Sequence, residues 1–222
     1  MLPSPIKVGK ALFAEFPTLM QHAGVTVLET VAGLILGVLL GFLMAALMDA
    51  CEPLRKGIYP LLVITQTIPT VAIAPLLILW FSYGLTPKII LVVLASFFPI
   101  AIGLLDGFRG VDTDQIKLMR AMKANAWQIF WHVKFPSALM EFFAGLKIAV
   151  SYSLVSAVVS EWLGGTVGLG VYMTRVKKSY SYDKMFAVIM LVSLVSLIMI
   201  ALVNLIQYRV MPWTHCREEN QR

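Results

Sequence analysis

The first long apolar stretch of the chain decides the fold class and reads, from Gly24 to Met48, GVTVLETVAGLILGVLLGFLMAALM. A helix of around twenty mostly apolar residues crosses hydrocarbon about 30 Å thick. This stretch exceeds that length, and Glu29 is its lone charged side chain. It is also far longer than the apolar core of a signal peptide, and no small-residue cleavage pattern follows it. We therefore predict a true transmembrane helix here.

Four further stretches of the 222-residue chain are long and apolar enough to cross a membrane. They are Ile58–Phe81, Ile89–Leu105, Phe142–Val159 and Phe186–Ile206. Hydrophobic residues make up 59% of the chain and charged residues 14%, against roughly 45–50% and about 25% in soluble domains. No polar or low-complexity segment divides the spans. We predict an all-α integral membrane protein, with a bundle of about five transmembrane helices forming one domain over residues 1–222.

Two long connections, Asp106–Glu141 and Glu161–Met185, must lie on opposite sides of a five-span bundle. We place the first in the cytoplasm, because this puts a small excess of Lys and Arg, including the tail from Arg209 to Arg222, on the inner side. The net charge of +6 lies beside the spans, where basic side chains meet lipid headgroups. We therefore expect membrane lipid as a partner and no nucleic acid.

Nothing in the sequence predicts catalysis or a resident metal. Cys51 and Cys216 are isolated thiols in segments placed in the cytoplasm. The three histidines, His22, His132 and His215, have no ligand-like spacing. No glycine-rich phosphate loop, nucleophile elbow or zinc-binding helix motif occurs.

Glycines recur at every fourth residue of the first span, at Gly33, Gly37 and Gly41. They share one helix face and let a neighbouring backbone approach closely. This face predicts either packing within the chain or a contact between two copies of it.

The second span contains Gln66, Thr67 and Thr70 between or beside two prolines, Pro69 and Pro75. Each proline removes a backbone donor, so carbonyls near mid-membrane lose their partners, which is tolerated in a wet cavity or inside protein. The alternatives are a broken helix beside a pathway and a kink healed by neighbouring helices.

The connection Asp106–Glu141 predicts two short helices on the cytoplasmic side. Asp112 with Gln115, and Asn125 with Gln128, have the spacing of capping boxes. We expect helices over about 113–123 and 126–134, with Pro136 ending the second. Trp127 and Trp131 then share an aromatic face that either docks a partner protein or rests on the membrane interface.

Several motifs, in order, resemble one family across nearly the whole chain. They are LPSP (2–5), IPTVAIAPLLILWF (68–81), DQIKLMRAMKANAWQIFWHVKFP (114–136) and SEWLGG (160–165) followed by GLG (168–170). The chain is similar to type I ABC importer permeases of the nitrate, sulfonate, taurine and pyrimidine branch. Members usually carry another helix before the LPSP stretch, so either the sequence begins inside a longer protein or this member has five spans.

The resemblance implies a multi-pass bacterial cell membrane permease that imports a solute, working with separate ATP-binding subunits, an extracytoplasmic solute-binding protein and a second permease copy. ATP and Mg would be bound by the partner ATPase, so no cofactor is expected on this chain. The coupling contacts would come from Arg120, Ala121, Lys123, Ala124, Asn125, Ala126, Trp127 and Phe130.

The coupling loop departs from the family pattern. The family's Glu-Ala-Ala positions fall on Lys117, Leu118 and Met119, and its turn glycine falls on Lys123. We expect Asn125 to supply the bend, because asparagine tolerates left-handed backbone angles. The alternative is a strained Lys123.

Candidate pathway residues are polar groups at membrane depth. They are Gln66 and Thr67 in the second span and Ser153, Ser156, Ser160 and Glu161 in the fourth. Each serine alone also fits a hydrogen bond to its own helix. Resemblance places thiamine precursors such as hydroxymethylpyrimidine first among solutes, ahead of riboflavin, sulfonates and nitrate. The alternatives of other classes are an ion-coupled secondary transporter, for which no inverted repeat is visible, and an intramembrane enzyme, for which no His or carboxylate cluster is visible.

Overall fold

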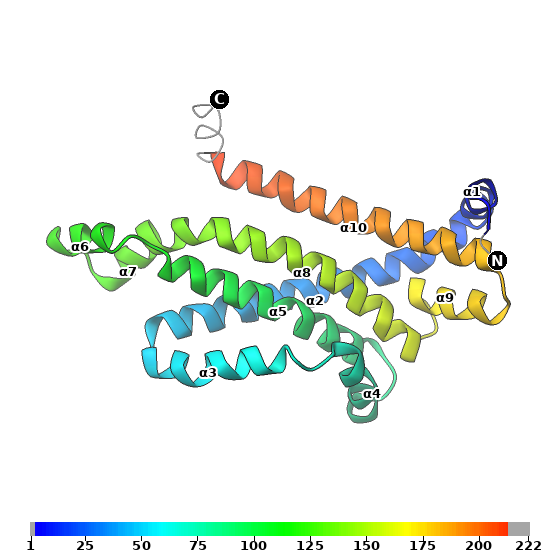
Figure 1. The fold of residues 1–222 in the computed structure, drawn as a ribbon, viewed down its shortest axis with the longest axis horizontal. Coiled ribbons are helices and arrows are strands. Elements are labelled where there is room, and N and C mark those ends of the chain that lie inside the picture. Colours follow the sequence, from blue (N-terminus) through cyan, green and yellow to red (C-terminus); the bar gives the residue numbers. More distant parts are fainter. Residues whose placement is uncertain (1–2, 213–222) are drawn as a thin grey trace.

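The computed structural model describes residues 3–212, in which every regular element is helical. The elements run in the order α1 (Pro5–Ala14), α2 (Phe16–Ala50), α3 (Glu52–Thr65), α4 (Thr70–Phe81), α5 (Leu85–Arg109), α6 (Thr113–Ala121), α7 (Ala126–Ile129), the π-helical turn η1 (Phe130–Lys134), α8 (Phe135–Leu163), α9 (Leu169–Lys178) and α10 (Tyr182–Val210). Figure 1 shows them as an elongated bundle. His215, Cys216 and the predicted cytoplasmic tail to Arg222 lie outside the described residues.

Within residues 3–212, four helices are long and apolar enough to span a membrane: α2, α5, the continuous helix through α7, η1 and α8, and α10. The pair α3 and α4 passes the same test together, but the two helices meet at an angle of 98°. Four of the five predicted spans are therefore present as single helices, and the second corresponds to the bent pair α3 and α4. The structure confirms the broken helix over a healed kink, because the residues between Thr65 and Thr70 leave the helix at Pro69, whereas Pro75 stays inside α4.

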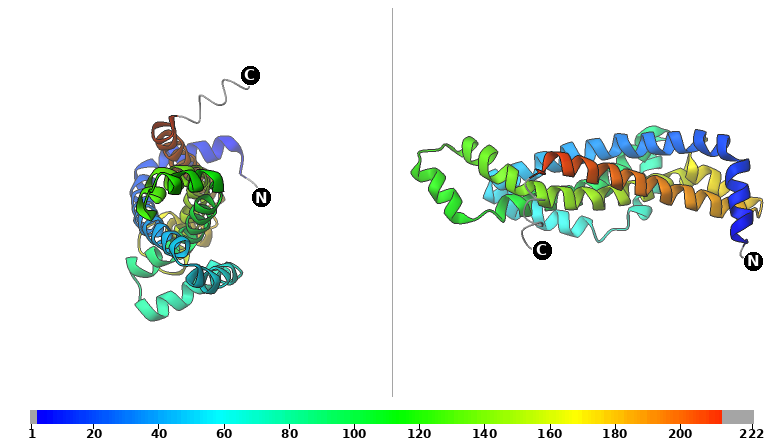
Figure 2. Two further views of the ribbon diagram at one scale, coloured as in Figure 1. Left: turned by 90° about the vertical axis from the view of Figure 1, so that its left-hand side faces the viewer. Right: turned by 90° about the horizontal axis from the view of Figure 1, so that it is seen from above.

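The two long connections lie at opposite ends of the bundle, as predicted. Helices α6 and α7 extend beyond one end, while α1 and α9 gather at the other (Figures 1 and 2). Helix α1 lies across the bundle and packs Val8 and Ala11 against Ala187 of α10. The second connection contains α9, whose buried Leu169, Tyr172 and Val176 follow helical spacing.

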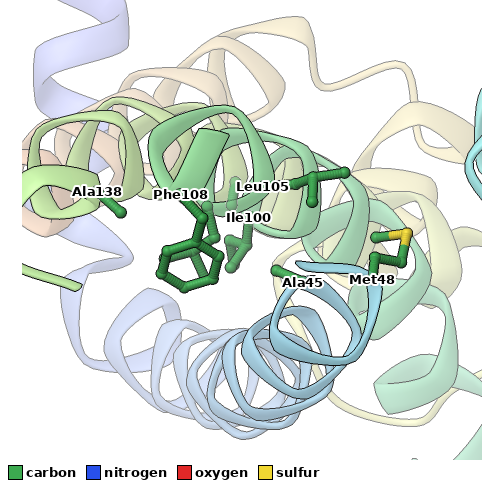
Figure 3. Close-up of a cluster of buried hydrophobic side chains, with 8 residues drawn as sticks. Ala45, Met48, Ile100, Leu105, Phe108 and Ala138 are labelled. Atoms are coloured by element: carbon green, nitrogen blue, oxygen red, sulfur yellow. The ribbon is translucent and has the colours of Figure 1, made fainter. Parts of the chain in front are cut away.

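Helix α5 is the centre of the bundle, packed between α2 and α8. A Cβ built on Gly37 would overlap Ser96 of α5, and one on Gly41 would lie 2.9 Å from Ile100. The glycine row is therefore an intramolecular seam. A second seam joins α5 to α8, where a Cβ on Gly145 would lie 2.5 Å from the Pro99 carbonyl oxygen. Figure 3 shows the apolar core between α2, α5 and α8, to which Ala45, Ile100 and Ala138 contribute side chains.

The prediction that Pro136 ends the second loop helix is wrong. The chain passes through η1 directly into α8, with Pro136 in the first turn of α8. In η1 the Phe135 N–H donates to the Phe130 carbonyl, five residues back. A π turn widens the helix locally and so makes room for Pro136, which has no N–H and crowds the preceding turn.

Candidate coupling loop and transport pathway

Both loop helices begin where the sequence predicts. The Asp112 carboxylate accepts the Asp114 N–H at 2.9 Å, so it caps α6 without the expected reciprocal bond from Gln115. At α7 the full capping box is present. The Asn125 side chain accepts the Gln128 N–H at 2.8 Å, and the Gln128 side chain accepts the Asn125 N–H at 2.9 Å.

The turn between the helices is made by Lys123, and the expectation that Asn125 makes it is wrong. Lys123 has φ 61°, in the left-handed region, whereas Asn125 is extended at φ −79° and ψ 168°. The Lys123 N–H donates to the Arg120 carbonyl and the Ala124 N–H donates to the Met119 carbonyl. These two bonds form a Schellman motif, in which the left-handed position usually holds glycine. Asn125 is already committed to capping α7, which requires extended angles.

The loop exposes apolar side chains at its tip. Leu118, Met122, Trp127 and Trp131 are exposed, Trp127 at 68%, and the two indole rings lie 5.5 Å apart. Among the predicted coupling residues, Ala124 is half-buried, Phe130 is turned inward against Phe108 with ring centroids 5.2 Å apart, and the others are exposed. The tip therefore presents an apolar surface, and its helices α6 and α7 extend beyond the end of the bundle (Figure 1).

The break between α3 and α4 opens onto a cavity of about 810 Å³ that α5 and α8 complete. Gln66 and Ser156 line it, so the structure brings these two predicted pathway residues together. Thr67 is exposed at the same break but does not line the cavity. Cavities of this size hold small organic ligands.

The other two serines of the fourth span lie elsewhere. Ser153 is fully buried, and its hydroxyl has no hydrogen-bond partner among the described residues. Ser160 is buried and donates to the Ala157 carbonyl of its own helix at 2.7 Å. The predicted row is therefore split, with Ser156 alone on the cavity.

Glu161 is buried at the opposite end of the bundle from the loop and fastens α8 and α9 to α2. Its carboxylate accepts Thr26 Oγ1 at 2.7 Å and the Gly170 N–H at 2.6 Å. The Gly168 N–H donates to His22 Nδ1 at 2.9 Å. Gly168 has φ 139°, and a Cβ there would overlap the Glu161 carboxyl group. Glu161 therefore holds the glycine-rich connection in place and does not face the cavity.

Comparison with known proteins decides the family. Residues 37–212 match the family described as "Binding-protein-dependent transport system inner membrane component". The chain belongs to this permease family. It is 37% identical over 197 residues to a probable ABC transporter permease of Haemophilus influenzae, covering 89% of this chain and 80% of that one. It is 35% identical to the formylaminopyrimidine transport permease ThiX of Halalkalibacterium halodurans, covering 96% and 86%.

The same branch includes a riboflavin transport permease of Chloroflexus aurantiacus, 34% identical over 96% of this chain and 80% of that one. Two solved structures share the fold. An amino acid ABC transporter superposes with a TM-score of 0.74 at 18% sequence identity, covering 94% of this chain and 100% of that one. A methionine ABC transporter superposes with a TM-score of 0.71 at 19% identity, covering 90% of this chain and 97% of that one. The chain is thus an ABC transporter permease with membrane-spanning helices, and the secondary-transporter reading is not favoured.

The permease also contains a buried ion pair that the sequence analysis missed. Lys88 of α5 donates to Glu29 of α2 at 2.7 Å, and both side chains are at most 6% exposed. The sequence signal for this ion pair was Glu29, an ionisable side chain inside an apolar span. Within residues 3–212, no group of three His, Cys, Asp or Glu side chains is arranged to hold a metal ion.

Proposed function

We propose that this permease forms the solute pathway of an ATP-driven importer and that a separate ATP-binding subunit docks on residues 114–134. The exposed tip of α6 and α7 is the observation that carries the proposal, because it combines exposed apolar side chains with a hydrogen-bonded turn. Trp127, at 68% exposed, supplies the kind of aromatic anchor that dominates protein interfaces.

The rigid connection from the tip into the bundle suits transmission of motion. The turn η1 continues into α8 without a flexible linker, and α8 packs along α5. A displacement of α7 by a nucleotide-dependent partner would therefore move α8 as a lever. Such coupling requires a bundle with two arrangements, which the ATP-binding subunit biases from one side and a loaded binding protein from the other.

In this proposal two copies of the chain enclose the pathway, and an extracytoplasmic binding protein delivers the solute. ATP and Mg are bound by the partner subunits. The solute is a small organic molecule of the thiamine-precursor type. Relatives named for formylaminopyrimidine and riboflavin transport support this class.

Site-directed crosslinking tests the docking site. Cysteine is placed at Ala124 or Ala126 after Cys51 and Cys216 are changed to Ser. Both positions should crosslink to the ATP-binding subunit. Ser179, exposed in the connection at the opposite end, serves as the matched control and should not. Contact of residues 124 and 126 with lipid alone, while the ATPase attaches elsewhere, would overturn the assignment.

ATP hydrolysis by the purified complex separates an importer from an ion-coupled transporter. We expect hydrolysis to rise when the loaded binding protein is added. Solute uptake that follows an ion gradient and continues without ATP would contradict the proposal.

A further inference from the structure

The cavity beside the broken helix has a distinct charge. Of the described residues that line it, the charged ones are two acids, Asp106 on α5 and Glu141 on α8. Neither acid has an ion-pair partner within 4 Å in residues 3–212. A Cβ on Gly103 would lie 2.8 Å from the Glu141 carbonyl oxygen, and Asp106 is one turn beyond Gly103. Both acids therefore lie at the cavity end nearest the coupling loop.

The backbone at the break does not counter this negative charge. Helix α3 ends at Thr65 and α4 begins at Thr70, so a negative and a positive helix end meet and largely offset each other. The N–H groups that follow the last turn of α3 are also already used. Gln66, Thr67 and Ile68 donate to the carbonyls of Val63, Ile64 and Thr65.

One side chain at the break can only accept a hydrogen bond from a solute. The Thr65 hydroxyl lines the cavity and spends its hydrogen on the Leu62 carbonyl at 2.7 Å. Its lone pairs remain as acceptors. Phe97, Phe98 and Tyr152 give the walls aromatic surface, which suits a flat ring.

We propose that this cavity selects neutral or cationic aromatic solutes that carry hydrogen-bond donors, and turns away anions such as sulfonates and nitrate. The inference rests on the proposed role of the cavity as the solute pathway. A second hollow of about 650 Å³ follows, lined by the basic residues Arg55, Lys56 and Arg109 and sharing Asp106 with the first. An anion would have to pass the two acids before reaching those cations.

Charged thiol reagents measure this selectivity directly. The complete transporter, with Cys51 and Cys216 changed to Ser, receives a cysteine at Gln66 or at Tyr152. Each variant is reacted with three methanethiosulfonates that carry a trimethylammonium, a sulfonate or an uncharged methyl group. Rates are divided by those for a free thiol in solution. We expect the cationic reagent to be favoured over the anionic one by about tenfold, equal to about 1.4 kcal/mol.

Neutralising the acids supplies the control. In the Asp106→Asn/Glu141→Gln background, the preference should fall towards equal rates while the uncharged reagent reacts as before. An equal or faster rate for the sulfonate reagent in the native background overturns the inference and leaves the pathway intact. A preference for the cationic reagent that persists in the Asp106→Asn/Glu141→Gln background overturns the inference as well. Failure of all three reagents at both positions would instead overturn the cavity's role as an aqueous pathway.

Discussion

Replacing Lys123 with glycine should stabilise the turn between α6 and α7. Lys123 adopts φ 61° in the Schellman motif that ends α6. A side chain in this conformation costs roughly 1–2 kcal/mol, whereas glycine adopts it freely but loses up to about 1 kcal/mol more chain entropy on folding. The exposed Lys123 has no ion pair in the described residues to offset the loss. The net gain should be about 0.5–1 kcal/mol.

Hydrogen exchange of the turn measures this gain. The amides of Lys123 and Ala124 donate the two closing bonds, so a peptide covering residues 118–126 should exchange about two- to fivefold more slowly in Lys123→Gly. Coupled ATP hydrolysis should be retained.

Two control variants separate conformation from side chain. Lys123→Ala removes the charge but keeps the strained angle, so its exchange should match the native protein. Met122→Gly adds glycine at φ −77°, where any residue fits, so its exchange should be faster. Faster exchange in Lys123→Gly, or a rate equal to that of Lys123→Ala, would refute the argument that the turn is strained.

Three other changes test the remaining structure. Gly37→Leu should prevent stable assembly, because the leucine side chain would enter the space of α5. The control Gly24→Leu, with no atom within 4 Å of its Cβ position, should assemble normally in gel filtration. Normal assembly of both variants would contradict the seam between α2 and α5. Lys88→Met should destabilise the permease by about 3–5 kcal/mol in unfolding experiments, because it leaves Glu29 unpaired. Adding Glu29→Gln should recover most of this loss, and equal stability of the single and double variants would argue against the buried pair. Asn125→Ala should cost about 1 kcal/mol through the lost capping box and weaken coupled ATP hydrolysis, and unchanged exchange around α7 would contradict this.

Local signals in the sequence were sufficient for the bundle itself. Hydropathy located the four long helices and the bent pair α3 and α4, Pro69 marked the break, and the glycines at every fourth residue marked a tightly packed helix face. The caps at Asp112 and Asn125 marked both loop helices. Each of these features depends on residues within one or two turns, so the chain encodes them without reference to distant partners.

Errors in the loop arose where two local rules competed. Asn125 suits both a left-handed turn and a helix cap, and the cap prevailed because its two hydrogen bonds require extended angles. The left-handed role then fell to Lys123. Pro136 ordinarily ends a helix, but the π turn before it removed the clash. Sequence alone does not rank such alternatives, since the difference between them is about 1 kcal/mol.

The sequence by itself determined that this protein is a bundle of membrane-spanning helices with prolines in the second span and a capped, aromatic loop between the third and fourth spans. Only the tertiary structure decided which polar groups meet. Thr26 and Glu161 are 135 residues apart in the chain, yet they are hydrogen-bonded. Ser153 and Ser156 belong to one predicted row, yet only Ser156 lines the cavity. Asp106 and Glu141 both line the end of this cavity that is nearest to α6 and α7. Helical periodicity fixes which residues share a face, but the facing partner is set by how α2, α5 and α8 pack together, and that packing depends on contacts distributed over the whole chain.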